Sequence, residues 1–266
     1  MPAIDPISDP LDSRLAVYRD LPDATLLARH GLFMAEGELV VKLAIDHGIS
    51  LQSIVLTPAR VESLRPWLER AACPIHLVEP SVLDGIAGFH LHRGVLAAGH
   101  RPIPVEPVAL THRAKRVLIL EDLANHDNVG GLFRVAAAFG VQAVLLSPRC
   151  CDPLYRKAIR VSMGHALRIP FATLDPWLEG LETIREQGFN IAALTLGPDA
   201  RPPSALGVLT PEARLAIMVG TEGRGLSDHA QALATTRIRI PMAPGVDSLN
   251  VAVAAGIALA HVPLPD

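Results

Sequence analysis

The stretch "LEDLANHDNVGGLFRVAAAFGVQAVLLSP", residues 120–148, decides the fold of the second half of the chain. Apolar segments on either side predict strands near 117–121 and 142–147. Between them, residues 129–139 are predicted to form a helix that ends at Gly140, because glycine readily adopts the left-handed conformation that closes helices. A buried strand, a helix and a second buried strand in this order are typical of a parallel sheet with both faces covered.

Arg134 is the unusual residue of that predicted helix. Almost every other position is small or apolar, which predicts that both faces of the helix are buried. The residues three and four positions away from Arg134 are Gly130, Gly131, Ala137 and Ala138, so no carboxylate within the helix faces the guanidinium. Arg134 is therefore either paired with a group far along the chain or held for a substrate.

The composition predicts a folded protein of one large or two ordinary domains. The chain has 266 residues, of which 50% are hydrophobic and 19% charged. Its net charge of −3 gives no overall attraction for a polyanion, although a local arginine-lined groove is compatible with it. No segment predicts a membrane span, and the N-terminus is acidic and rich in proline. The three cysteines, Cys73, Cys150 and Cys151, lack metal-site spacing. We expect a soluble cytoplasmic protein with reduced thiols, no metal and no membrane partner.

Prolines and mixed charges at residues 99–116 predict a linker between two domains. We place an N-terminal domain at 1–104, the linker at 105–114 and a second domain at 115–266. In the first, helices at 36–49, 61–71 and 81–88 alternate with strands at 51–58, 74–80 and 92–100. In the second, strands near 117–121, 142–147, 167–171, 190–195, 215–219 and 237–240 alternate with helices near 129–139, 154–161, 176–187, 226–233 and 248–261. Both domains are therefore predicted to be α/β.

The segment "IMVGTEGRGLS", residues 217–227, is a strand that runs into a glycine-rich loop. Glycines at the carboxyl end of a strand let backbone amides approach a ligand. The dinucleotide fingerprint would need a third glycine at 228 after Gly223 and Gly225, but Asp228 stands there, and no G-K-[ST] phosphate loop is present. These departures disfavour a nucleotide-dependent oxidoreductase. Glu222 is either a solvated loop carboxylate or part of a site.

The segment "RIRIPMAPGVDSLNVAVAAGIALAH", residues 237–261, predicts a strand, a proline- and glycine-containing loop and a helix from about Ser248. Asp247 or Ser248 would cap this helix. Asn250 lies in its first turn, before an apolar run. Its amide either satisfies a free backbone group or takes part in a site.

The three segments together resemble the motifs of a known enzyme family. Asn128-x-Gly130-x-x-x-Arg134, Gly220-x-Glu222-x-x-Gly225, and Ile240-Pro241-Met242 with Ser248-Leu249-Asn250-Val251 resemble, in order and spacing, the three motifs of the SpoU (TrmH-type) branch of the SPOUT methyltransferases. This resemblance runs from about residue 115 to the C-terminus. The first half is similar to the L30e-like substrate-binding domain of rRNA 2′-O-ribose methyltransferases, in "LFMAEGELVVKLA" (32–44) and "HRGVLAAG" (92–99).

The resemblance implies a trefoil-knotted α/β catalytic domain, a homodimer formed through that domain, and S-adenosylmethionine as the cofactor. By the family's motif positions, the cofactor would be bound by Thr195, Leu196, Gly197, Gly220, Ile240, Met242 and Leu249. No metal is implied. The expected reaction is methyl transfer to a ribose 2′-hydroxyl of RNA. Ribosomal RNA is favoured over tRNA because of the additional N-terminal domain, and a catalytically inactive RNA-binding paralogue is the alternative of another class.

For the catalytic step, the resemblance assigns removal of the hydroxyl proton to Arg134, held by Asn128. Glu222 would orient Arg134 or the substrate, and Ser248 with Asn250 would position the acceptor. A guanidinium keeps its own proton at neutral pH and is a poor base. A second interpretation is therefore that Arg134 binds the adjacent phosphate and stabilises the developing alkoxide.

Overall fold

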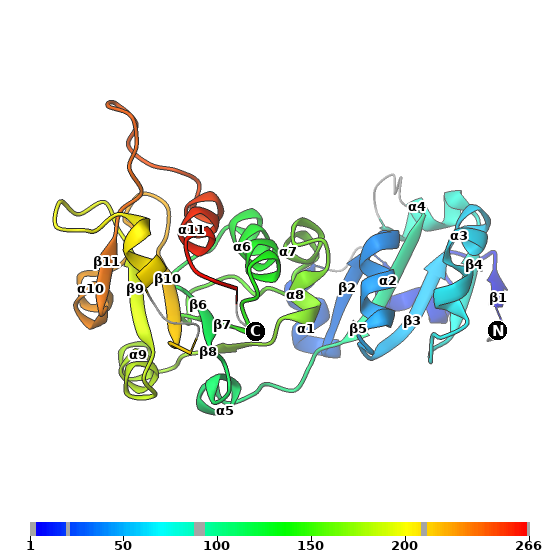
Figure 1. The fold of residues 1–266 in the computed structure, drawn as a ribbon. Helices are drawn as coiled ribbons and strands as arrows, with labels where there is room; N and C mark the ends of the chain where they lie inside the picture. The colour runs from blue at the N-terminus through cyan, green and yellow to red at the C-terminus, as the bar shows by residue number, and fades with distance from the viewer. Residues whose placement is uncertain (1–3, 20–21, 88–93, 209–211, 265–266) are drawn as a thin grey trace. The chain divides into compact units, whose positions relative to one another are not determined.

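The computed structural model describes residues 4–19, 22–87, 94–208 and 212–264. Two compact units divide the chain (Figure 1): the first contains the residues up to Ile103 together with Pro153–Arg168, and the second contains Pro104–Asp152 and the residues from Ile169 onward. The second unit thus differs from the predicted second domain, 115–266, in two segments: it also contains residues 104–114, and it lacks residues 153–168. The predicted linker contains a short helix, α5 (Pro107–Thr111).

The first unit is built on a five-stranded mixed sheet in the order β1-β4-β3-β5-β2. Its strands are β1 (Ile4–Ile7), β2 (Leu32–Glu36), β3 (Leu51–Leu56), β4 (Ile75–Val78) and β5 (Val95–His100). Its helices before β5 are η1 (Ser13–Tyr18), α1 (Asp23–His30), α2 (Glu38–Asp46), α3 (Pro58–Leu68) and α4 (Pro80–Ala87). The predicted alternation of helices and strands from residue 36 is confirmed, whereas β1, η1, α1 and β2 were not predicted. The first two residues of the predicted strand 92–100 lie outside the described residues.

Segment 153–168 joins the first unit through two short helices, α7 (Arg156–Val161) and α8 (His165–Arg168). The backbone N–H of Arg156 donates to the Asp23 carboxylate at 2.9 Å. The guanidinium of Arg160 lies 3.7 Å from the carboxylate of Glu36, which is only 6% exposed. The strand predicted at 167–171 is wrong over its first residues, because α8 ends there and the strand, β8 (Phe171–Thr173), begins later.

The second unit is built on a six-stranded sheet in the order β11-β9-β10-β6-β7-β8, in which every pairing is parallel. The further strands are β6 (Arg116–Leu120), β7 (Ala143–Leu146), β9 (Asn190–Leu194), β10 (Leu215–Val219) and β11 (Thr236–Ile238). The helices are α6 (His126–Ala138), α9 (Trp177–Glu186), α10 (Asp228–Leu233) and α11 (Val251–Ala260), with the 3-10 helix η2 at Pro203–Val208. This confirms the α/β class and the mostly parallel sheet.

Helices cover both faces of the six-stranded sheet (Figure 1). On one face, Leu181 and Ile184 of α9 and Ala230 of α10 pack against alternate strand residues such as Ile119 and Met218. On the other face, α11 packs on α6 and β10. Because successive strand residues point to opposite faces, strands covered in this way are apolar throughout, as "RVLIL" and "LAIMV" are.

Two arginines close the amino-terminal edge of this sheet. The Arg214 guanidinium, just before β10, donates to the backbone carbonyls of Ala114, Gln187 and Thr111 at 3.1, 2.5 and 2.5 Å. Arg116, at the start of β6, is 1% exposed, and its guanidinium donates to the carbonyl of Ala213 at 2.7 Å. Both guanidiniums thereby donate hydrogen bonds to backbone carbonyls at the edge of the sheet, where the strands provide no donor.

Candidate functional site

A cavity of about 770 Å³ opens at the carboxyl ends of β9, β10 and β11. Its walls come mainly from residues 194–197, 219–226 and 238–254. Parallel strands end at the same edge of a sheet, so the loops that follow neighbouring strands converge there. The volume lies in the range typical of sites for small molecules and cofactors.

The structure brings most of the predicted site residues together around this cavity. Its lining includes all seven residues predicted to bind a cofactor, namely Thr195, Leu196, Gly197, Gly220, Ile240, Met242 and Leu249. Glu222, Ser248 and Asn250 also line it, and all three are exposed. Asn128 and Arg134 do not line it. The Leu196 side chain is 54% exposed and that of Leu249 37%, so the cavity presents apolar surface that is not covered by protein.

The glycine-rich loop after β10 folds back tightly on itself. A Cβ atom at Gly220 would lie 2.3 Å from the carbonyl carbon of Gly225, and Thr221 forms an isolated antiparallel bridge with Gly225. Gly223 and Gly225 have φ angles of +88° and +70°, in the left-handed region that favours glycine. Gly220 is therefore required by the packing of the loop itself, a reason that the sequence alone did not reveal.

Asn250 joins two of the three motifs. It is the N-cap of α11, and its Oδ1 accepts hydrogen bonds from the backbone N–H groups of Ala252 and Val253 at 3.0 and 3.3 Å. Its Nδ2 donates to Oδ1 of Asn128, 122 residues earlier in the chain, at 2.9 Å. The predicted start of this helix at Ser248, capped by Asp247 or Ser248, is wrong, because the Asn250 side chain performs the capping.

Arg134 lies on the exposed side of α6. The prediction that both faces of this helix are buried is wrong, since Val129, Leu132 and Phe133 form a single buried face. Within the described residues, the Arg134 side chain makes no hydrogen bond or ion pair, so it is held neither by Asn128 nor by Glu222 or Asn250 within one chain. Asn128 is only 4% exposed, and the side chain it contacts is Asn250.

α6 begins at His126, three residues before the predicted start. Asn125 caps it: the Asn125 side-chain oxygen accepts from the backbone N–H of Asp127 at 2.8 Å. This extra turn places Asn128 inside the helix, on the side that faces α11.

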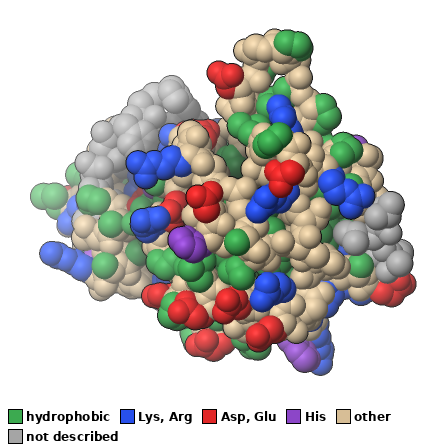
Figure 2. All heavy atoms as spheres, turned by 90° about the vertical axis from the view of Figure 1, so that its left-hand side faces the viewer, with side chains coloured by type: hydrophobic (Ala, Val, Ile, Leu, Met, Phe, Trp, Pro, Cys, Tyr) green, Lys and Arg blue, Asp and Glu red, His purple; other side chains and the backbone are tan. Residues whose placement is uncertain are grey.

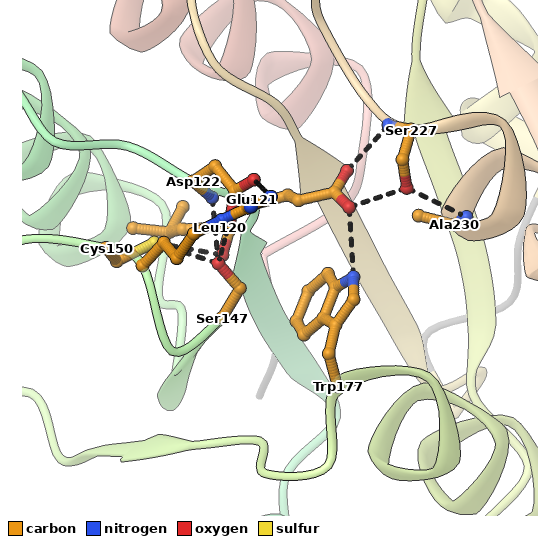
Figure 3. Close-up of polar contacts among 9 residues, drawn as sticks. Leu120, Glu121, Asp122, Ser147, Cys150, Trp177, Ser227 and Ala230 are labelled. Atoms are coloured by element: carbon orange, nitrogen blue, oxygen red, sulfur yellow. Dashed lines mark hydrogen bonds and ion pairs between the residues drawn. The ribbon is translucent and has the colours of Figure 1, made fainter.

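Glu121 is a buried carboxylate that the sequence reading did not single out (Figure 3). It follows β6 and is 5% exposed. One carboxylate oxygen, Oε1, accepts from Ser227 Oγ at 2.6 Å and from Trp177 Nε1 at 3.0 Å, while Oε2 accepts from the Ser227 backbone N–H at 2.8 Å. Ser227 Oγ in turn caps α10 by accepting from the backbone N–H of Ala230 at 3.2 Å. Glu121 therefore anchors the end of the glycine-rich loop to the sheet, and only its position directly after a buried strand could have indicated this.

Asp122, the next residue, makes a separate polar cluster. Its φ is +56°, its backbone N–H donates to Ser147 Oγ, and Ser147 Oγ donates to the Asp122 carboxylate, both at 2.8 Å. The carboxylate is also paired with Arg149. Hydrogen bonding to Arg149, followed by that to Ser147, lowers the pKa of Asp122 below its ordinary value.

The surface around the cavity carries charges of both signs. The lining contains Glu222 and Asp247 beside Arg224. Figure 2 shows one face of the molecule, on which basic side chains do not form one continuous field. Among the described residues, no group of three or more His, Cys, Asp or Glu side chains is placed to hold a metal ion. None of the helices in the described part of the chain is long and apolar enough to cross a membrane.

Comparison with known proteins identifies the class to which this fold and site belong. Residues 115–260 match the model of the SpoU rRNA Methylase family. An uncharacterised tRNA/rRNA methyltransferase of Mycobacterium bovis is 40% identical over 260 residues, which cover 95% of this chain and 89% of that protein. The chain therefore belongs to the SpoU family of RNA methyltransferases.

Solved structures share the fold over nearly the whole length. The AdoMet-bound rRNA methyltransferase of Sinorhizobium meliloti has a TM-score of 0.82 at 21% identity, with 97% of each chain covered. The SpoU methyltransferase AviRb of Streptomyces viridochromogenes, in complex with AdoMet, has a TM-score of 0.77 at 20% identity, with 94% of this chain and 97% of that chain covered. The similarity of fold thus extends over nearly the whole chain and not only over the family's motifs.

Proposed function

We propose that this protein transfers a methyl group from S-adenosylmethionine to a ribose 2′-hydroxyl of RNA, with ribosomal RNA as the substrate. The observation that carries the proposal is the cavity, which is lined by all seven predicted cofactor residues and by Glu222, Ser248 and Asn250 at once. Segments far apart in the sequence meet there, namely the loop at 194–197 and the second and third motifs. Several relatives support it: two solved neighbours hold AdoMet, and one is an RNA 2′-O ribose methyltransferase.

The residues of the cavity fit S-adenosylmethionine. Leu196, Ile240 and Leu249 offer apolar side chains to an adenine ring, and the two leucines are substantially exposed without it. The backbone groups of Gly197 and of the loop at 220–225 supply donors and acceptors for the polar parts of the cofactor. Thr195 and Met242 complete the proposed contacts. When bound, the cofactor supplies an activated methyl group on sulfur.

The protein's own contribution is to align the acceptor hydroxyl and to stabilise the charge that develops on it. Ser248 and Glu222 are exposed at the cavity and are available to an incoming ribose. Asn250 uses its oxygen for the α11 cap and its amide N–H for Asn128. We therefore infer that Asn128 and Asn250 act by fixing the start of α11, and with it Ser248 and Leu249, more than by touching the substrate.

Arg134 is proposed as the residue that meets RNA. Its guanidinium is exposed and makes no hydrogen bond or ion pair in the described structure, which is the state expected of a group reserved for a phosphate. We favour the role in which Arg134 binds the phosphate and hydrogen-bonds the developing alkoxide, because a guanidinium does not release its proton at neutral pH.

We also infer a homodimer, a trefoil knot in the second unit and an L30e-like fold for the first unit. The dimer is supported by α11, whose apolar residues extend around the whole helix while Val253 remains 51% exposed. Sedimentation of the wild-type protein and of Val253→Glu tests the dimer, and a monomeric wild-type protein would contradict it. The knot and the L30e-like fold rest on membership of the family. An RNA substrate would place the protein in the cytoplasm.

The substrate is tested by mapping 2′-O-methylated nucleotides in total RNA from cells with and without this protein. We expect one or a few sites in ribosomal RNA to be lost with the protein. If 2′-O-methylated sites were lost in tRNA alone, the substrate would be tRNA and not ribosomal RNA. The remaining alternative is a catalytically inactive RNA-binding paralogue. Calorimetric titration of the purified protein with S-adenosylmethionine tests it: binding heat excludes this alternative, and no binding heat supports it.

A further inference from the structure

Gln231 connects two of the loops that form the cavity. Its Oε1 accepts a hydrogen bond from Thr195 Oγ1 at 3.1 Å, and its Nε2 donates to the backbone carbonyl of Leu226 at 2.9 Å. Thr195 belongs to the loop after β9, and Leu226 to the loop after β10. Both partners and Gln231 itself line the cavity. These two bonds use the oxygen and the nitrogen of one amide, so only glutamine at this position satisfies both partners.

The loop after β9 depends on the same contact. Thr195 Oγ1 donates its proton to Gln231 and accepts from the backbone N–H of Gly197 at 3.3 Å. The hydroxyl therefore stabilises the turn over residues 195–197, where Leu196 presents its exposed side chain to the cavity. If the Gln231 acceptor is lost, the hydroxyl has no fixed orientation, and the turn loses one of the hydrogen bonds that hold it beside the bond from the Thr195 backbone N–H to the Ile238 carbonyl.

The helix that carries Gln231 is itself fixed to the sheet. α10 begins after Ser227, which caps it and is held by the buried carboxylate of Glu121, as Figure 3 shows. Trp177 of α9 holds the same carboxylate from the other side. The amide of Gln231, one turn into α10, is therefore presented from a rigid support rather than from a mobile loop.

We propose that Gln231 is a positioning residue, which latches the loop at 194–197 to the loop at 220–226 and so sets the width of the cofactor cavity. The inference rests on the proposed function of that cavity as the S-adenosylmethionine site. Gln231 lies outside the three motifs. Its two hydrogen bonds would fix the distance between the apolar wall at Leu196 and the glycine-rich wall of the cavity. Cofactor affinity should therefore depend on a side chain whose hydrogen-bonding groups are already occupied by protein.

The test compares two glutamines that make the same kinds of bonds at different places. Gln187 accepts from Thr111 Oγ1 at 2.7 Å and donates to the carbonyl of Val108 at 3.3 Å. Like Gln231 it is half-buried, but it does not line the cavity. The change to glutamate replaces the donor by an oxygen that faces a carbonyl in both cases. Gln231→Glu and Gln187→Glu should therefore both lose thermal stability, with the loss in Gln187→Glu offset in part by the neighbouring Arg214 guanidinium.

Binding of S-adenosylhomocysteine, measured by isothermal titration calorimetry on the full chain, separates the two variants. In Gln231→Glu the bond from Thr195 can remain, but the bond to the Leu226 carbonyl is replaced by repulsion between two oxygens. We therefore expect Gln231→Glu to bind about tenfold more weakly than the wild type, and Gln187→Glu to bind as the wild type does. Unchanged affinity for S-adenosylhomocysteine in Gln231→Glu, or equal losses of affinity in both variants, would contradict the proposed role of Gln231. A wild-type protein that does not bind at all would instead overturn the cavity as the cofactor site, and the latch with it.

A double-mutant cycle tests whether Gln231 acts through Thr195. Thr195→Val removes the hydroxyl and keeps the shape, and Gln231→Ala removes the amide. If the two side chains form one latch, the double variant should bind S-adenosylhomocysteine no more weakly than the weaker single variant. Losses that multiply would mean that the residues contribute independently, which contradicts the proposal.

Discussion

The amino-terminal edge of the six-stranded sheet and the outer face of α6 both carry arginines, but these arginines are in opposite situations. Arg214 and Arg116 donate to backbone carbonyls, and Arg116 is almost fully buried. Arg134 is exposed and, within the described residues, has no hydrogen-bonding or ionic partner. Two carboxylates repeat the contrast: Glu121 accepts from Ser227 and Trp177, whereas Glu222 lies exposed at the cavity. Charged groups already satisfied by protein stabilise the fold, and the unsatisfied ones are available to a substrate.

The largest effect is expected for Arg134→Ala. If Arg134 contacts the phosphate and the developing alkoxide, methyl transfer to RNA should fall by about 10² to 10³-fold. The free energy of unfolding should change by less than about 0.5 kcal/mol, because the side chain makes no polar contact in the described structure. Single-turnover transfer of radiolabelled methyl groups and urea unfolding provide the two measurements. A variant that is strongly destabilised would show that Arg134 belongs with the structural arginines.

Arg214→Met should reverse this pattern. The substitution keeps the aliphatic stem but leaves the carbonyls of Ala114, Gln187 and Thr111 without their donor. We expect a loss of about 3 kcal/mol in the free energy of unfolding, the cost of unsatisfied partly buried acceptors. Methyl transfer per folded molecule should remain close to that of the wild type. Retained stability with reduced turnover would contradict the contrast between the two regions.

Glu121→Gln and Glu222→Gln apply the same comparison to the carboxylates. In Glu121→Gln an amide N–H₂ replaces an oxygen that now accepts from Ser227 or Trp177, so a loss of about 2 kcal/mol in unfolding free energy is expected. Glu222→Gln should leave stability within about 0.5 kcal/mol of the wild type. Thermal unfolding of the two variants measures both changes in stability. Equal losses of stability in the two variants would refute the assignment of Glu222 to the substrate.

The smallest effect concerns pH and the Asp122 cluster. The pKa of Asp122 is lowered in the folded state, chiefly by Arg149. The contribution of Asp122 to stability is therefore present above the unfolded-state pKa of about 3.9, and it is lost as the pH falls through the folded-state pKa. Because Arg149 is largely exposed, the contribution should be on the order of 0.5 kcal/mol. Asp122→Asn, which tolerates the same backbone angles, should be less stable than the wild type at pH 7, and the difference should shrink toward pH 3. A difference that does not depend on pH would exclude the charge as its cause.

Much of the second unit could be predicted from the sequence because its strands are buried on both faces and read as continuous apolar runs. The glycines and polar residues at the strand ends indicated a site, but the residues around the cavity could be named only because the three segments resemble the motifs of a known family. Contacts between distant side chains could not: the bond between Asn128 and Asn250 joins two local patterns that each have an ordinary explanation. The short segment 153–168 gave no sign that it packs with the first unit, since ion pairs such as Arg160 with Glu36 depend on tertiary folding. The small neighbours of Arg134 predict a helix that is buried on both faces, but small residues also occur on exposed helix faces, as they do here.

The central claim is that this cavity serves methyl transfer to a ribose hydroxyl. Purified protein incubated with methyl-labelled S-adenosylmethionine and unmodified ribosomal RNA tests it most directly, followed by alkaline hydrolysis of the RNA. A methyl group on the 2′-oxygen removes the nucleophile for strand cleavage, so the label should appear in an alkali-resistant dinucleotide. Label in a mononucleotide would place the methyl group on a base, and the absence of label in any RNA would contradict the proposed activity.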